Sequence, residues 1–121
     1  MQVMLLIYSD ETAWAALSGA DKAAAFAAYG AYTDALREAG AMVAGAPLQP
    51  TGTAHTVRVQ SGTPQVLDGP YAETREQLGG YYLIEVPDMQ AALRWAARCP
   101  GAAHGTVEVR PLMPMPAMAP A

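Results

Sequence analysis

The first apolar stretch of the chain is continuous, because positions 3–8 read Val-Met-Leu-Leu-Ile-Tyr. A strand with one face in water alternates apolar and polar residues, whereas a continuous run indicates burial on both faces. We therefore expect a central strand at 3–8 with protein on each side. Residues 55–60 and 106–110 alternate in the usual way, and 81–86 form a further apolar strand.

Two helices are predicted between these strands. Ser18 and Asp21 have the spacing of a capping box, and the helix that follows should run to about Ala39 and end at Gly40. Asp88 should cap the second helix. Both helices carry side chains at helical spacing that should face the sheet. These are Phe26, Tyr29, Tyr32 and Leu36 on the first helix, and Met89, Ala92, Leu93, Ala96 and Ala97 on the second.

An extra hairpin is predicted in the middle of the chain. Strand 55–60 turns at Ser61-Gly62, returns at 64–67 and is broken by Asp68-Gly69-Pro70-Tyr71. With a small strand at 41–45, the order is β-α-β-(β-β)-β-α-β, a ferredoxin-like split βαβ pattern with an inserted hairpin. One antiparallel sheet with its helices on one face leaves the other face bare. We therefore expect a homodimer in which two sheets pack bare face to bare face.

The composition fits a single α+β domain. The chain has 121 residues, of which 52% are hydrophobic, many of them alanine, and 15% are charged. High apolar and low charged content argue against disorder. Few charged side chains remain to cover the surface, so some apolar surface should contact a partner. We expect the domain to span 1–112 and the Met, Pro and Ala residues of 113–121 to form a disordered tail.

Charge and motif content exclude several functions. The net charge is −4 and the seven basic residues are scattered, so no nucleic-acid footprint is present. The run 1–8 is too short to span a membrane and lacks the basic flank of a signal peptide. Cys99 is the one cysteine, which fits a reducing, cytoplasmic setting. His55 and His104 are the two histidines and stand in no ligand spacing, so neither a metal nor a cofactor is expected.

Asp68 is the best polar candidate for chemistry. A carboxylate on the flank of a sheet-lined pocket could act as a general base or bind a cationic or hydroxyl group. It could equally hold an Asx-type turn by accepting hydrogen bonds from backbone N–H groups. In that turn Gly69 would take a conformation closed to other residues, restricted further by Pro70. The two roles are compatible.

Tyrosines supply the remaining pocket candidates. The chain has six tyrosines against one phenylalanine, and phenol groups among apolar residues need partners. They could line a pocket with polar tips, or they could be ordinary core and dimer-interface residues. His55 has the pattern of a surface or turn histidine, and Cys99 that of a small buried apolar residue. The ligand-pocket candidates are Tyr8, Tyr29, Tyr32, Asp68, Gly69, Pro70, Tyr71 and Tyr82.

Residues 67–86, Leu-Asp-Gly-Pro-Tyr-Ala-Glu-Thr-Arg-Glu-Gln-Leu-Gly-Gly-Tyr-Tyr-Leu-Ile-Glu-Val, resemble the DGPF branch of the YCII-related family. The name of that branch has Phe where this chain has Tyr71, and both side chains carry an aromatic ring. The resemblance implies a ferredoxin-like fold that forms a dimeric α+β barrel. It covers nearly the whole chain, with further matches at 4–8, 48–50, 91–100 and 105–111.

In the wider YCII superfamily some members are thought to act on small molecules through a His–Asp pair. Its His lies on the first long helix and its Asp follows the second helix in an Asp-Pro step. The resemblance puts Tyr29 and Cys99 in those positions. An ordinary Tyr keeps its proton up to about pH 10 and a thiol up to about pH 8.5, so the proton shuttle cannot be carried over.

Three functions are compatible with these features. The first is a small-molecule enzyme or binder with a pocket between the sheet and the long helix. The second is a non-catalytic regulatory or interaction module, since genes of the family often neighbour those of extracytoplasmic-function sigma factors. The third is a structural dimer without a ligand. A retained ligand would distinguish the first, and capture of a sigma-factor-linked partner the second.

Overall fold

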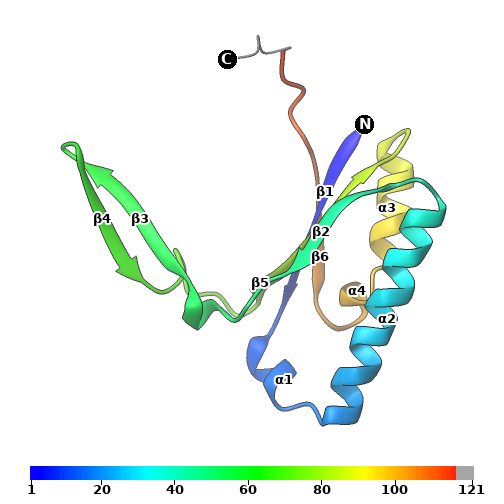
Figure 1. The fold of residues 1–121 in the computed structure, drawn as a ribbon, viewed down its shortest axis with the longest axis horizontal. Helices are drawn as coiled ribbons and strands as arrows, with labels where there is room; N and C mark the ends of the chain where they lie inside the picture. Colours follow the sequence, from blue (N-terminus) through cyan, green and yellow to red (C-terminus); the bar gives the residue numbers. More distant parts are fainter. Residues whose placement is uncertain (117–121) are drawn as a thin grey trace.

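A computed structural model gives the fold of residues 1–116, and its centre is an open, four-stranded antiparallel sheet in the order β2-β5-β1-β6 (Figure 1). The two apolar runs of the sequence form the two central strands, because a central strand has neighbours along both edges. The predicted α+β class is confirmed, the strands and the two main helices follow one another along the chain as predicted, and the sheet of one chain is not a closed barrel. The strands are β1 (Gln2–Ser9), β2 (Met42–Pro47), β5 (Gln77–Glu85) and β6 (Thr106–Pro111).

The long helix α2 (Gly19–Glu38) begins and ends where its local signals predict. The Ser18 hydroxyl accepts a hydrogen bond from the Asp21 amide at 3.1 Å, which satisfies one of the free N–H groups of the first turn. Gly40 has φ +69°, the left-handed conformation that commonly ends a helix.

Helix α3 (Met89–Arg98) is capped by Asp88, whose carboxylate accepts a hydrogen bond from the Ala91 amide at 2.8 Å. Three short helical segments complete the described chain: α1 (Glu11–Ala15), η1 (Thr51–Thr53) and α4 (Gly101–His104). No helix of residues 1–116 is long and apolar enough to cross a membrane.

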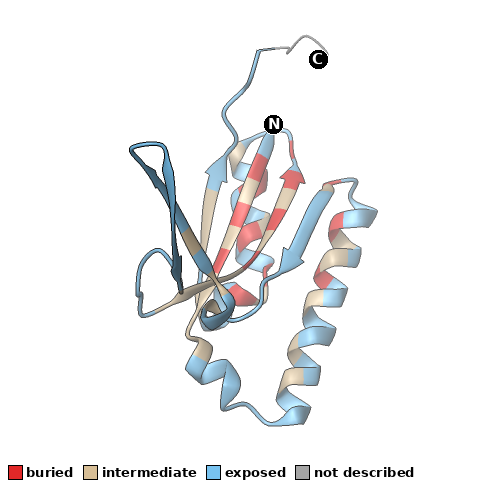
Figure 2. Cartoon of the chain, turned by 60° about the vertical axis from the view of Figure 1, so that its left-hand side comes forward, coloured by how far each residue is buried: buried red, intermediate tan, exposed pale blue. Residues whose placement is uncertain are grey.

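The core lies between the sheet and the helices. Along β1, Val3, Leu5 and Ile7 are buried against the helices, and the residues between them are half-buried on the opposite face. Figure 2 shows this alternation as red and tan bands along the central strands. The predicted burial of 3–8 on both faces is therefore not reached within one chain. On β1 and β5 the open sheet face carries Met4, Leu6, Tyr8, Tyr81 and Leu83, and β6 adds the ion pair of Glu108 and Arg110, opposite Leu6 and Met4.

The predicted helix stripes need two corrections. Tyr32 and Leu36 of α2 are buried, but Phe26 is 62% exposed and packs edge to face on Trp14, with the ring centroids 5.5 Å apart. On α3 the buried residues are alanines, which let the helix lie close to the sheet, while Leu93 and Ala97 are exposed.

The hairpin of β3 (His55–Gln60) and β4 (Thr63–Asp68) forms a two-stranded sheet of its own, which we call the arm. Its turn has positive φ at both Ser61 and Gly62, as in the tight turns that match strand twist. The predicted hairpin is confirmed, but it does not join the main sheet.

The arm stands on the opposite side of the main sheet from α2 and α3 (Figure 1). The turned view agrees, with the arm in front of the sheet and α3 behind it (Figure 2). Of the predicted tail, residues 113–116 are exposed and form no helix or strand, and 117–121 lie outside the described residues.

Candidate functional site

A cavity of about 490 Å³ lies between α1, α2 and the ends of β2 and β5, and we call it the sheet–helix pocket. This volume is in the range that holds a small organic molecule. Its walls are mainly apolar, with Ile7, prolines and leucine beside a group of aromatic rings. The aromatic lining residues are Trp14, Phe26, Tyr29, Tyr81 and Tyr82.

The polar lining of the sheet–helix pocket contains one charged side chain, Glu11. Both of its carboxylate oxygens are occupied by Thr51, whose amide and hydroxyl donate hydrogen bonds at 2.7 and 2.8 Å. The Glu11 amide in turn donates to Gln77 Oε1 at 3.0 Å. Glu11 therefore ties α1 to η1 and β5, and no Lys, Arg or His among the lining residues offers a positive charge to an anionic ligand.

Tyr29 and Cys99 meet beside the pocket. The chain passes close to both at Gly101, where an added Cβ would lie 2.7 Å from the Tyr29 hydroxyl and 3.9 Å from the Cys99 sulfur. Burial, with the neighbouring Cys99, raises the pKa of Tyr29 to about 12, and burial also raises the pKa of the Cys99 thiol. Both groups keep their protons at neutral pH, so Tyr29 can serve as a hydrogen-bond donor and not as a base.

Tyr32 and Tyr82 form a neighbouring network in the core. Their rings pack edge to face with centroids 5.3 Å apart. The Tyr32 hydroxyl donates to the Trp95 carbonyl at 2.7 Å, and the Tyr82 and Thr33 hydroxyls are hydrogen-bonded at 2.8 Å. Tyr82 also lines the pocket, but Tyr32 does not. Tyr8 lies on the open sheet face, away from both.

Asp68 lies on the arm and not at the sheet–helix pocket. Its carboxylate is 3.0 Å from His55 Nδ1, across the last residue pair of the hairpin, and its side chain is 94% exposed. This imidazole, and not the expected backbone N–H group, is the hydrogen-bond partner of Asp68 within residues 1–116. The predicted turn is instead held by the backbone of Gly69, which has φ +102° and whose amide donates to the Ala54 carbonyl at 2.7 Å.

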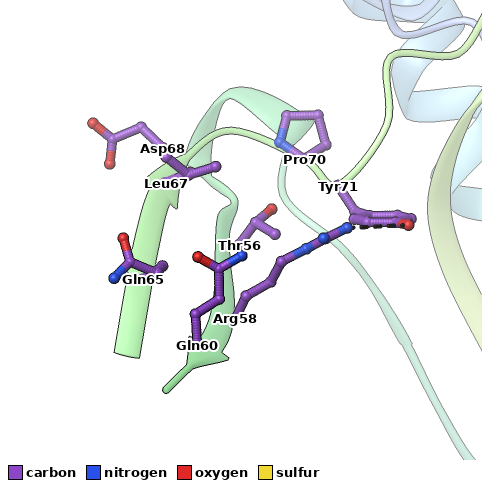
Figure 3. A pocket seen from close by; sticks show the side chains of 8 residues that line it. All are labelled: Thr56, Arg58, Gln60, Gln65, Leu67, Asp68, Pro70 and Tyr71. Atoms are coloured by element: carbon purple, nitrogen blue, oxygen red, sulfur yellow. Dashed lines mark hydrogen bonds between the residues drawn. The ribbon is translucent and has the colours of Figure 1, made fainter. Parts of the chain in front are cut away.

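A second hollow of about 410 Å³ lies along the arm, where Pro70 and Tyr71 fold back over β3 and β4. Figure 3 shows Arg58 reaching toward Tyr71, while the Asp68 carboxylate points away from both. The Arg58 guanidinium carbon is 5.5 Å from the centre of the Tyr71 ring. The predicted site residues are therefore not brought together: Tyr29 and Tyr82 line the pocket, and Asp68, Pro70 and Tyr71 line the arm hollow. Tyr8, Tyr32 and Gly69 line neither.

Comparison with known proteins identifies the family. The model of the YCII-related domain matches residues 1–116. The chain belongs to the YCII-related family. One YCII-like relative, the "Uncharacterized protein R00369" of Rhizobium meliloti (strain 1021), is 38% identical over 114 residues, which are 93% of this chain and 92% of the relative.

For a YCII-related protein, the contact between Tyr29 and Cys99 is informative. These are the two positions where the resemblance expected the His–Asp pair, and the fold brings them together at the pocket. At these two positions the chain has two groups that hold their protons at neutral pH. Among residues 1–116, no group of three His, Cys, Asp or Glu side chains could hold a metal ion.

Raising the pH above 10 should destabilise this YCII-related protein. Burial raises the pKa of Tyr29, Tyr32 and Tyr82, whereas unfolded tyrosines titrate near 10. The folded chain then holds more protons than the unfolded chain, so stability is full below pH 10 and falls as the pH rises toward about 12. Urea midpoints measured across this window test the effect. Tyr29→Phe should make the urea midpoint fall less steeply with pH. Tyr71→Phe, which changes an exposed ring, should leave the slope as it is. A urea midpoint that does not change with pH would contradict the raised pKa of the buried tyrosines.

Several pocket residues were missed by sequence reasoning. Phe26 was predicted only as a helix-stripe residue, Tyr81 only as part of the strand 81–86, and Trp14 was not singled out. These residues come together at the pocket because of the path that the chain takes from β1 through α1 into α2. No short sequence motif predicts that path. The short apolar helix after Asp10 was the available signal, because it places a large ring just after a central strand.

Proposed function

We propose that this YCII-related protein binds a small, uncharged organic molecule in the sheet–helix pocket. The observation that carries the proposal is the lining itself: the aromatic residues Trp14, Phe26, Tyr29 and Tyr82, no positive side chain and one carboxylate that Thr51 already occupies. An anionic ligand would lose its water there without gaining a cation, whereas an apolar ring would bury its surface. Tyr29 would donate a hydrogen bond to a carbonyl or similar acceptor on the ligand.

Transformation of the ligand would need a proton acceptor. Tyr29 and Cys99 hold their protons at neutral pH, so neither fills that role. Asp68 is the proposed base for such a reaction, and its exposed carboxylate beside His55 is chemically suited to it. Because Asp68 stands on the arm, this catalytic role requires the ligand to reach the arm hollow as well.

Three further assignments belong to the same proposal. The chain is a member of the DGPF branch, because Asp68-Gly69-Pro70-Tyr71 keeps its motif with a tyrosine ring. It is cytoplasmic, because its one cysteine is buried and reduced. It is a homodimer built on the open sheet face, whose five large side chains stay half-buried in one chain.

Binding should be visible through Trp14, which lines the pocket, while Trp95 lies outside it. We expect 2-naphthamide to change the tryptophan emission and 2-naphthoate, which differs in its negative charge, to bind about tenfold more weakly or not at all. Trp14→Phe should abolish the signal. Tyr29→Phe should weaken naphthamide binding by about tenfold through the lost hydrogen bond.

Asp68→Asn is the matched control for this titration, because Asp68 lies on the arm. It should leave naphthamide binding unchanged. If Asp68→Asn abolishes binding and Tyr29→Phe does not, the ligand site belongs to the arm. Preferred binding of naphthoate would contradict the uncharged-ligand proposal. Native mass spectrometry of the purified chain reports a retained ligand and the dimer mass together.

The second candidate function is a non-catalytic regulatory or interaction module linked to extracytoplasmic-function sigma factors. The exposed apolar side chains of the arm favour a protein contact at that end of the molecule. Pull-down with a sigma factor tests this candidate. Capture that depends on the arm, together with no naphthamide binding, would favour it over the ligand-binding proposal.

A further inference from the structure

The arm has little within its own chain to pack against. Val57, Val59 and Val66 are exposed to 60%, 66% and 61%. β3 and β4 pair with each other and with no other strand of residues 1–116. A two-stranded hairpin alone is at best marginally stable in water, because it buries too little apolar surface. The arm therefore needs a surface to cover it.

One side of the arm is apolar from its turn to the pair of His55 and Asp68 at its base, and the other side is polar apart from Leu67. The strand register sets Val57 opposite Val66 and Val59 opposite Pro64 on one side, which we call the valine side. The other side carries Thr56, Arg58, Gln60 and Gln65 around the arm hollow. Because successive strand residues alternate, a surface that covers the valine side leaves Arg58 and its neighbours free.

The arm and the open sheet face lie on the same side of the molecule. In Figures 1 and 2 the helices cover one face of the sheet, and the arm rises on the opposite side. A molecule seated on Leu6, Tyr81 and their neighbours would therefore lie beside the arm as well. The two uncovered apolar surfaces of this chain are in a position to share one occupant.

We propose that this occupant is a second copy of the chain and that the valine side of each arm packs against the body of the other copy. The inference rests on the proposed dimer and adds the arm to its interface. Under twofold symmetry each copy supplies both an open sheet face and an arm, so both surfaces of both copies are covered at once.

Size and charge favour the second copy. A standard interface buries about 800 Å² on each partner, which is large for the five half-buried residues of the open sheet face. The valine side provides the additional exposed apolar surface. Two chains that each carry a net charge of −4 can meet at Val57, Val59, Pro64 and Val66, which are uncharged. The one carboxylate of this side, Asp68, lies at its base beside His55.

A matched pair of double variants tests the arm. Val57→Thr with Val66→Thr keeps β-branched residues of similar shape on the valine side, so the hairpin should still form. Arg58→Thr with Gln65→Thr changes the opposing pair on the polar side. In sedimentation equilibrium the first variant should raise the dimer dissociation constant about a hundredfold, since four apolar positions per dimer become polar, and the second should leave it within about threefold.

The outcomes separate the arm from the dimer. If the valine variant dimerises like the wild type while Leu6→Glu yields monomers, the sheet dimer stands and the arm proposal is overturned. A wild-type chain that is monomeric at tens of micromolar, about the usual range of such measurements, overturns both. Hydrogen exchange gives a second readout: amides of β3 and β4 should be protected in the dimer and exposed in the Leu6→Glu monomer. Equal, fast exchange in both would show that the arm is free for another partner.

Discussion

Replacing Leu5 with alanine should lower the free energy of unfolding by about 3–4 kcal/mol. Leu5 is fully buried on β1, and β5 and β6 flank it in the sheet. Tyr82 lies opposite it on the same side of the sheet, facing the helices. Strands on both edges of β1 keep the backbone from collapsing into the space that the missing side chain leaves. A cavity of this kind loses both the transfer free energy and the packing of its walls.

Urea denaturation with a constant m-value would measure the loss. Leu93→Ala is the matched control, because it removes the same atoms from a half-exposed position on α3. It should cost less than about 1 kcal/mol. If both variants lost the same free energy of unfolding, the burial of Leu5 would not contribute to the stability of the core.

Leu6→Glu should convert the proposed dimer to monomers. Leu6 is the next residue along β1 and points to the other side, onto the open sheet face. Two copies packed by this face would bury an added carboxylate from each chain. Within its own chain that carboxylate would lie opposite Glu108, which already pairs with Arg110. The dissociation constant should rise by at least about a thousandfold. The fold of each chain should persist, because Leu6 is only half-buried within it.

Light scattering gives the mass at equal chain concentrations, and circular dichroism checks that the fold is kept. Leu93→Glu makes the same change of charge and shape on α3, on the far side of the sheet, and should remain dimeric. A dimeric Leu6→Glu chain would place the interface elsewhere. Together, the variants at Leu5 and Leu6 test two roles of β1, because neighbouring strand residues point to opposite sides. Leu5 points to the core, and Leu6 points to the open sheet face.

The sequence predicted those features of the fold that depend on a few adjacent residues. Ser18, Gly40 and Asp88 mark helix ends, and each works through hydrogen bonds or dihedral angles within one turn. The strands were found for the same reason, from apolar runs at 3–8 and 81–86 and from alternation at 55–60 and 106–110. The rotation of α3 could not be found in this way: Leu93 and Ala96 are both apolar, and only the close approach of the helix to the sheet decides which one is buried.

The candidate site was predicted less completely, because its residues come from distant segments. Tyr29 was found because it belongs to a helix stripe, whereas Trp14 and Tyr81 join it only in three dimensions. Asp68 was expected beside this pocket because the strands on either side of it were read as neighbours in one sheet. The arm is a separate two-stranded unit, so its distance from the pocket depends on the loops that join it to the sheet.

The paired strands of the arm also bear on how the chain avoids aggregation. Each strand of a free hairpin has one edge without a hydrogen-bonded neighbour, and such edges can recruit strands from other molecules. Here β4 contains Pro64, which has no N–H group to offer, and β3 contains the charged Arg58. A single chain therefore exposes valines on a hairpin whose edges discourage the growth of a larger sheet.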